Sequence, residues 1–208
     1  HLQTYRALSK PKRSNAHGIL RLKEALHKAF HELDELLRNA DQPSGSTAVV
    51  VLLTPSHIVT ANVGDSRAIL RRYGTVIPLS FDHKPHHILE RIRIVNSGFR
   101  VRNRRVNGVL SVSRAFGDFG HKPAVIVDPD FTVYPRDNAG DEFIVLACDG
   151  VFDVASNREC GEFVQHLLSK GKMDMGSICE EALDVCLERR SRDNITMILV
   201  GLPAIKAD

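Results

Sequence analysis

Two carboxylates stand at the ends of two apolar runs, and their positions suggest a shared site. Asp149 follows residues 143–147 after one intervening cysteine, and Asp193 comes shortly before residues 195–200. Runs of β-branched and large apolar residues that end abruptly in polar residues predict buried strands. If these two strands are neighbours, the end of one lies beside the start of the other, and the two carboxylates converge.

The chemistry expected of converging carboxylates is the binding of a hard, oxygen-loving cation. No Cys or His stands at ligand spacing beside Asp149 or Asp193, so Mg²⁺ or Mn²⁺ fits better than Zn²⁺. Each Asp alone also has a simpler interpretation, because an Asp after a strand often forms a turn or caps a helix. The rest of the sequence must decide between these interpretations.

Composition indicates an ordinary globular chain. Its 208 residues are 43% hydrophobic and 25% charged, with a net charge of +3, which is too small to indicate nucleic-acid binding by itself. No apolar run approaches the roughly 18 residues of a membrane span, and the N-terminus has no signal-peptide pattern. The four cysteines lack close pairing. This suits a reducing compartment, so we expect a cytoplasmic or nuclear location.

The elements that must position the two carboxylates are predicted from hydrophobic periodicity. Apolar residues at spacings of three and four predict helices at about residues 14–39, 89–96, 158–169 and 175–189. Besides the two runs above, strands are predicted at residues 47–53, 58–63, 67–73, 76–79, 99–106, 125–127 and 131–134. Sequential strands joined by short turns are expected to pair antiparallel. Strands and helices in separate groups indicate an α+β fold, with antiparallel sheets covered by helices.

Two other groups of residues have weaker claims to a function. His27 and His31 lie one helical turn apart and could bind a metal, but the sequence shows no third ligand, so we expect exposed helix histidines. Arg100, Arg102 and Arg104 alternate along an expected strand and would give it a basic face. That face is expected to be solvated, although beside a metal site it could receive an anionic substrate. A nucleic-acid-binding module built on these arginines is a third, disfavoured hypothesis.

Six motifs together carry a resemblance to a known family. In chain order they are Ser44-Gly45-Ser46-Thr47-Ala48, Asn62-Val63-Gly64-Asp65-Ser66-Arg67, Asp82-His83-Lys84-Pro85, Arg105-Val106-Asn107-Gly108 running on to Ser113-Arg114-Ala115-Phe116-Gly117-Asp118, Cys148-Asp149-Gly150-Val151-Phe152-Asp153, and Ser191-Arg192-Asp193-Asn194. Each motif alone is weak. In this order and spacing they resemble the metal-dependent serine/threonine protein phosphatases of type 2C, the PPM family, over roughly residues 44–200. The resemblance implies a four-layer α-β-β-α sandwich of antiparallel sheets, with residues 1–208 forming a single domain.

The resemblance also implies an activity and residues that perform it. The family hydrolyses phosphoserine and phosphothreonine in proteins with a water that bridges two Mn²⁺ or Mg²⁺ ions, which lower the pKa of that water and neutralise the phosphoryl oxygens. Asp149 and Asp193 match residues that bind these metals. Asp118 matches a residue expected to help hold a third, weaker ion, and Asp153 would support a metal-bound water. Residues 82–114 resemble the family's flap, a mobile segment beside the cleft linked to substrate choice.

The sequence departs from the family near its N-terminus. The family's Glu-Asp pair and its Asp-Gly-His-Gly-Gly motif, whose Asp bridges both metals, do not occur in these 208 residues. We expect the natural protein to carry them upstream of His1, so that this chain alone would be inactive. The alternative is a catalytically inactive pseudophosphatase that serves as a protein-binding scaffold. Retention of Asp118, Asp149 and Asp193 favours the first hypothesis, because such carboxylates repel one another without a cation.

The same departure leads to an expectation about partners. Since the family's sheets include strands that precede this chain, we expect it to expose strand edges and apolar surface, both of which promote association. Either another polypeptide supplies the missing N-terminal strands, or the chain alone is poorly soluble. Phosphorylated proteins are the expected substrates, and neither nucleic acid nor a membrane is an expected partner.

Overall fold

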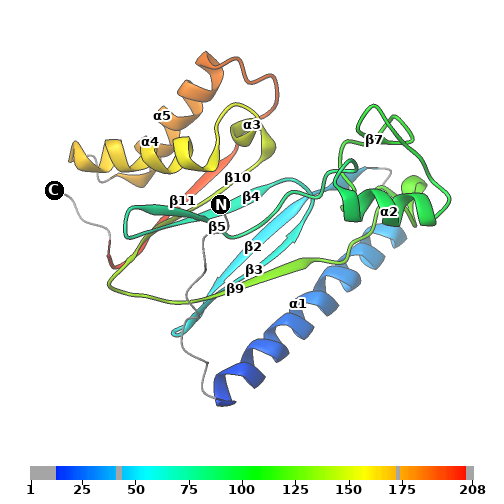
Figure 1. Ribbon diagram of the computed structural model, residues 1–208, viewed down its shortest axis with the longest axis horizontal. Coiled ribbons are helices and arrows are strands. Elements are labelled where there is room, and N and C mark those ends of the chain that lie inside the picture. The colour runs from blue at the N-terminus through cyan, green and yellow to red at the C-terminus, as the bar shows by residue number, and fades with distance from the viewer. Residues whose placement is uncertain (1–12, 41–43, 172–173, 205–208) are drawn as a thin grey trace.

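Two antiparallel sheets packed face to face form the centre of the structure (Figure 1). The computed structural model describes residues 13–40, 44–171 and 174–204. The first sheet has the strand order β11, β10, β4, β5, and the second has the order β2, β3, β9. The strands of the first sheet are β11 (Met197–Gly201), β10 (Asp141–Ala147), β4 (Arg67–Arg72) and β5 (Thr75–Pro78), and those of the second are β2 (Ala48–Leu53), β3 (His57–Val63) and β9 (Asp130–Pro135).

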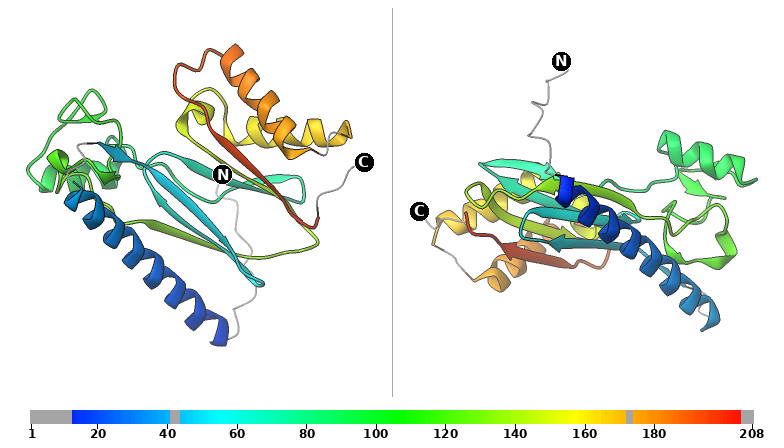
Figure 2. Two further views of the ribbon diagram at one scale, coloured as in Figure 1. Left: turned by 180° about the vertical axis from the view of Figure 1, so that it is seen from behind. Right: turned by 90° about the horizontal axis from the view of Figure 1, so that it is seen from below.

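Helices cover the outer faces of both sheets. The helices α4 (Asn157–Ser169) and α5 (Met175–Glu188) lie over the four-stranded sheet, and α1 (Arg13–Asn39) runs along the three-stranded sheet on the opposite side (Figure 2). Along β10, Phe143 packs toward α4 and α5, whereas the next residue, Ile144, packs between the two sheets. This alternation is the period of two expected of a strand buried on both faces. The predicted α+β fold, a four-layer α-β-β-α sandwich, is confirmed.

The shorter elements connect these layers. One ribbon pairs β1 with β8, another pairs β6 with β7, and each is antiparallel. A separate apolar cluster holds α2 against the segments on either side of the β6–β7 ribbon. The bounds of the short elements are β1 (Gly45–Ser46), α2 (Ile88–Asn96), β6 (Val101–Arg102), β7 (Arg105–Val106), β8 (Phe116–Gly117), η1 (Phe119–His121) and α3 (Asp149–Phe152).

The prediction of one strand over residues 99–106 is wrong. Asn103 and Arg104 have φ angles of 50° and 62°, so the chain turns there and forms the β6–β7 ribbon. Because Arg104 lies in the turn, the three predicted arginines do not alternate along one strand. The strand predicted at residues 125–127 is also wrong, since the structure has only an isolated bridge between Arg114 and Ile126 there. Periodicity shows which residues favour extended backbone, but not where the chain reverses.

The expected pairing of sequential strands holds only in part. The pairs β2–β3 and β4–β5 are antiparallel as predicted. However, β3 does not pair with β4, because the turn at residues 64–66 carries the chain from the three-stranded sheet into the four-stranded sheet. The site described below includes a residue of this crossing.

Packing of α1 gives a test of the layered fold. Phe30 is 5% exposed and its ring centroid lies 5.0 Å from that of Phe116. Phe30→Ala should lower the free energy of unfolding by about 3–5 kcal/mol, because it leaves a cavity under the helix. Leu36→Ala on the same helix is the control, since Leu36 is 65% exposed and its loss should change stability by less than about 1 kcal/mol. Urea unfolding of both variants measures this, and equal losses would contradict the placement of α1.

Candidate active site

Pairing of β10 with β11 brings the two predicted metal ligands together. The strands are antiparallel, and Ala147 at the end of β10 lies opposite Met197 at the start of β11. Asp149 is the first residue of α3, immediately beyond β10. Asp193 lies in the loop that leads into β11, where its own carboxylate accepts the backbone N–H of Asn194 at 2.7 Å. The convergence expected from the sequence is therefore present at this edge of the sheet.

Close backbone contacts hold the two carboxylate-bearing loops against each other. The N–H of Cys148 donates to the carbonyl of Thr196 at 3.2 Å, and the Ser191 hydroxyl donates to the carbonyl of Gly150 at 2.7 Å. A Cβ on Gly150 would lie 2.4 Å from the carbonyl oxygen of Asn194. Only glycine therefore permits this approach, and the Asp-Gly sequence positions Asp149 close to the Asp193 loop.

An open cleft of about 460 Å³ lies beside these loops. Three of the four predicted site residues line it, namely Asp149, Asp153 and Asp193. Asp153 follows α3, and its N–H donates to the carbonyl of Asp149 at 2.7 Å. The remaining lining residues all come from the flap segment. Lys84, Arg104 and Arg105 are positively charged, and the others are His86, Asn103 and Ser111. Acidic and basic groups thus line the same cleft.

A fourth carboxylate, Asp65, also acts on this site, and sequence reasoning missed it as a ligand candidate. Burial raises the pKa of Asp149, and the negative charges of Asp65, Asp193 and Asp153 raise it further. Asp65 is 4% exposed and lies in the crossing between the two sheets. The signal was available in the sequence, because Asp65 follows an apolar strand through one glycine, much as Asp149 follows another through one cysteine.

The crossing that carries Asp65 is tightly packed. Gly64 has a φ of 101°, and a Cβ there would lie 2.2 Å from the Thr47 side chain. The hydroxyls of Thr47 and Ser66 form a hydrogen bond of 2.8 Å across the turn. The motif at residues 44–48 therefore packs against the motif at residues 62–67, and this contact fixes the position of Asp65.

Lys84 is the cation that pairs with this acidic cluster. Its ammonium group forms an ion pair and hydrogen bond with Asp65. Burial by itself lowers the pKa of Lys84, but the hydrogen bond and charge of Asp65, with the charges of Asp153 and Asp82, outweigh it and keep the pKa above its ordinary value. Lys84 also lowers the pKa of Asp149, although less than the acidic neighbours raise it. Negative charge therefore remains in excess around Asp149.

Buried polar contacts fix the segment that carries Lys84. Arg67 makes a bidentate pair with Asp82, with distances of 2.8 and 2.7 Å. His83 is 3% exposed, and its Nδ1 accepts the N–H of Gly64 at 3.0 Å while its Nε2 lies 3.1 Å from the carboxylate of Asp130. These contacts hold the flap's first residues against the crossing between the sheets.

Asp118 lies elsewhere. It is absent from the described residues that line the cleft. Its carboxylate occupies the space beside Gly45, where a Cβ would lie 2.0 Å from Oδ2. Burial raises the pKa of Asp118, whereas the charges of His121 and Lys122 lower it. The structure therefore does not bring Asp118 together with Asp149 and Asp193, and its role in holding a weaker metal stays a prediction.

A buried ionic network anchors the flap to the body of the protein. Glu90 on α2 is 6% exposed and accepts hydrogen bonds from Arg93 at 2.8 Å and Arg114 at 2.7 Å. Arg114 also donates to the Asp130 carboxylate at 2.9 Å. Burial raises the pKa of Glu90, but the hydrogen bonds from Arg114 and Arg93 and the charge of Arg114 reverse this and lower the pKa from 4.5 to about 2.

The donor set of the cleft fits hard divalent cations. Asp149, Asp153 and Asp193 line the cleft, and the negative charge of Asp65, which Lys84 pairs with, also acts on Asp149. Oxygen ligands with an excess of negative charge are what Mg²⁺ and Mn²⁺ prefer. None of the four cysteines lines this cleft, and Cys148 instead donates its thiol to the carbonyl of Asn194 at 3.2 Å.

Comparison with known proteins identifies the family. The family model described as Protein phosphatase 2C matches residues 1–195. Protein phosphatase 1B of Rattus norvegicus is 41% identical over 212 residues, covering 95% of this chain and 54% of that protein. Protein phosphatase ppm-1.A of Caenorhabditis elegans is 40% identical over 194 residues, covering 88% of this chain and 41% of that protein. The chain thus spans about half the length of these curated relatives.

Solved structures give the same fold. A Caenorhabditis elegans sex determining protein superimposes with a TM-score of 0.81 at 26% identity, over 88% of this chain and 47% of that chain. Serine-threonine phosphatase 2C from Toxoplasma gondii superimposes with a TM-score of 0.77 at 24% identity, over 93% of this chain and 72% of that chain. This chain belongs to the protein phosphatase 2C family. Among its described helices, none is both long and apolar enough to cross a membrane.

Gly150 gives a test of how the two ligand loops are held together. Gly150→Ala should lower the free energy of unfolding by roughly 1–3 kcal/mol and weaken Mn²⁺ binding, because the added Cβ pushes the Asn194 loop away from Asp149. Gly18→Ala is the matched control, since a Cβ on Gly18 meets nothing within 4 Å and alanine favours the helix. Urea unfolding and calorimetric Mn²⁺ titration measure the two effects. Unchanged stability and affinity in Gly150→Ala would contradict this account.

The lowered pKa of Glu90 predicts that the free energy of unfolding falls in acid. Its pKa is lower in the folded protein than when unfolded, so its contribution is full above pH 4.5 and is lost as the pH falls from there to about 2. Glu90→Gln should therefore cost roughly 3 kcal/mol at pH 7 and flatten the pH dependence of stability in that range. Urea unfolding at several pH values checks this, with Glu24→Gln on the exposed face of α1 as control. A wild-type slope retained in Glu90→Gln would refute the assignment.

Proposed function

We propose that this chain provides metal ligands and a substrate-binding wall for a Mn²⁺- or Mg²⁺-dependent phosphatase that acts on phosphoserine and phosphothreonine in proteins. The observation that carries the proposal is the convergence of Asp149 and Asp193 on one cleft through the pairing of β10 with β11, with Asp65 close enough for its charge to add to burial in raising the pKa of Asp149. Membership of the protein phosphatase 2C family supports the same activity. A cation between the carboxylates would relieve their repulsion.

Asp149 and Asp193 are the proposed principal metal ligands. Both line the cleft, Asp149 as a half-buried residue and Asp193 as an exposed one. When bound, two divalent cations lower the pKa of a water molecule and neutralise charge on the phosphoryl oxygens. Asp153, exposed one helical turn after Asp149, is placed to accept a hydrogen bond from water in the cleft.

The basic wall of the cleft is the proposed site for the substrate phosphate. Arg104 and Arg105 come from the β6–β7 ribbon and face the same cleft as the carboxylates. Arg104 contacts His86 at 2.8 Å, and Arg105 donates to the carbonyl of Val109 at 2.7 Å. Each guanidinium has further N–H donors, whose planar arrangement matches phosphate oxygens. In this proposal the arginines would orient the phosphorylated residue, and the carboxylates would hold the ions that neutralise its phosphoryl oxygens.

Substitution of the ligands tests the proposal in the complete natural protein. Asp149→Asn and Asp193→Asn should each lower kcat/KM toward a phosphoserine peptide by at least about 100-fold, because loss of a ligand charge lowers metal occupancy. Thermal melting should show an intact fold, and calorimetry should show weaker Mn²⁺ binding. Asp184→Asn, on the exposed face of α5, is the control. Near-normal activity with Mn²⁺ in either ligand variant would remove that residue from the site, whereas an inactive wild type that binds phosphoprotein would favour the scaffold hypothesis.

The same assay separates two interpretations of Asp118. If Asp118 holds a weaker ion, Asp118→Ala should reduce turnover and change its dependence on Mn²⁺ concentration while tight binding is unchanged. If Asp118 only shapes the turn beside Gly45, the variant should lose roughly 1 kcal/mol of stability in chelator and keep its turnover in Mn²⁺.

A further inference from the structure

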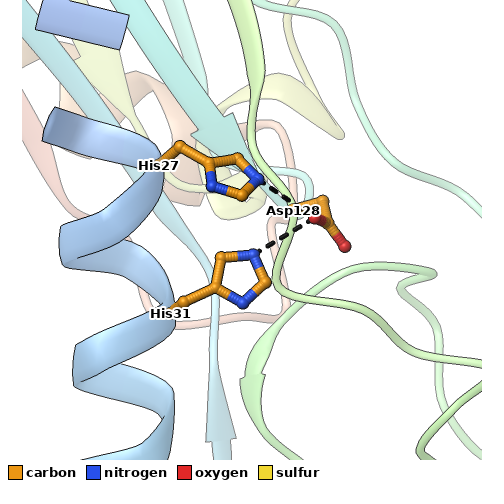
Figure 3. A group of neighbouring side chains, drawn as sticks. All are labelled: His27, His31 and Asp128. Carbon is orange, nitrogen blue, oxygen red and sulfur yellow. Dashed lines mark hydrogen bonds and ion pairs between the residues drawn. The ribbon is translucent and has the colours of Figure 1, made fainter. Parts of the chain in front are cut away.

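A second group of metal-ligating side chains lies on the other side of the three-stranded sheet from α4 and α5. His27 and His31 project from successive turns of α1 toward Asp128, in the segment just before β9 (Figure 3). Their Nε2 atoms lie 3.2 and 3.1 Å from the same oxygen, Oδ1 of Asp128. The two rings lie side by side, with centroids 4.5 Å apart. The third ligand that the sequence did not reveal is therefore present.

Two of the three donor-atom separations, from each Nε2 to the Asp128 oxygen, match a tetrahedral metal site. One donor atom from each of the three residues lies within 4.8 Å of the other two. Zn²⁺ binds imidazole nitrogen and carboxylate oxygen at about 2.0–2.1 Å, which places neighbouring ligands of a tetrahedron about 3.3 Å apart by simple geometry. The two nitrogen-to-oxygen distances are within 0.2 Å of that value. We propose that His27, His31 and Asp128 form a Zn²⁺ site that links α1 to the segment before β9.

The chemistry of these donors separates this site from the acidic cleft. Two imidazoles and one carboxylate favour Zn²⁺ or similar transition metals, whereas an all-carboxylate cluster favours Mg²⁺ or Mn²⁺. Three protein ligands leave one tetrahedral position, which water fills. The side chains of His27, His31 and Asp128 are 50%, 43% and 46% exposed, so an ion can enter from solvent.

Metal binding requires only a small change in the rings. Without the ion, each neutral histidine donates its Nε2–H to Asp128, and these two hydrogen bonds lower the carboxyl pKa against the opposing effect of burial. With the ion, each ring binds through the Nε2 lone pair and carries its proton on Nδ1 instead. Because both rings are about half exposed, water can accept a hydrogen bond from each Nδ1–H, as metal-bound histidines require.

The elements that carry the three ligands are already held in place by the core. Phe30, which lies between the two histidines in sequence, packs in the same apolar cluster as Val127, the neighbour of Asp128. One helical turn further, Asp34 accepts the N–H of Gly117 at 2.7 Å and pairs with Lys122 at 2.9 Å. Ligands on such rigid supports lose little freedom when they bind a metal.

The segment that carries Asp128 is anchored from the flap side as well. Arg114 donates to the backbone carbonyl of Asp128 at 2.9 Å and to the carboxylate of Asp130 two residues later. Asp130 in turn contacts His83, the neighbour of Lys84 in the cleft. A Zn²⁺ ion would therefore fix α1 against a segment that also supports one wall of the acidic cleft.

Zinc titration of matched variants tests the site. In buffer with excess Mg²⁺ to occupy the acidic cleft, the wild-type protein should bind one Zn²⁺ per chain at this site. His27→Gln, His31→Gln and Asp128→Asn should each weaken that binding by at least about 100-fold, because each removes one of three ligands. His17→Gln is the control, because His17 is an exposed histidine on the same helix. Glutamine preserves the helix, and melting in chelator should confirm that all variants fold.

Cobalt provides a second readout that does not depend on affinity. Co²⁺ bound to two imidazoles and a carboxylate in a tetrahedral site absorbs visible light more strongly than Co²⁺ in an octahedral oxygen site. This band should appear in wild type, His17→Gln and Asp149→Asn, and disappear in His31→Gln. Equal Zn²⁺ affinity in wild type and His31→Gln, or a band that is lost only in Asp149→Asn, would overturn the proposal and leave the three side chains as a hydrogen-bonded contact.

Discussion

Repulsion among carboxylates is the constraint on which the site depends. Asp65, Asp149 and Asp193 are brought together against their charges, and this repulsion adds to burial in raising the pKa of Asp149. The pairing of β10 with β11 and the close approach of Gly150 to the Asn194 carbonyl hold Asp149 near Asp193 despite this repulsion. A cation that neutralises the cluster then stabilises the same arrangement, so metal binding and local folding favour each other.

Surrounding elements compensate this charge only in part. Lys84 is held in place by Arg67, Asp82 and His83 and pairs with the most buried carboxylate, Asp65. The β6–β7 ribbon adds Arg104 and Arg105 to the lining of the cleft, where their guanidinium groups can contact an anion. Acidic groups that suit cations and basic groups that suit phosphate thus line the same cleft, which fits the hydrolysis of a phosphate ester.

Features that depend on neighbouring strands were predictable from the sequence, and those that depend on distant contacts were not. Asp149 and Asp193 could be predicted because each borders an apolar strand and the two strands pair. Asp65 was missed because its position depends on a crossing between sheets, which periodicity does not reveal. The left-handed turn at Asn103 and Arg104 broke a strand that alternation predicted. Asp128 lies 97 residues from His31, so no local pattern could connect them.

The crossing at residues 64–66 has a consequence for the integrity of the whole sandwich. Asp65 belongs to the junction of the two sheets, whereas Asp149 and Asp193 both border the four-stranded sheet. Sliding or separation of the sheets would move Asp65 away from the other two, even if every ligand remained chemically intact. If the cleft binds divalent cations as proposed, its affinity for them depends on the alignment of the two sheets, and a misassembled molecule would lose that affinity while its secondary structure is still intact.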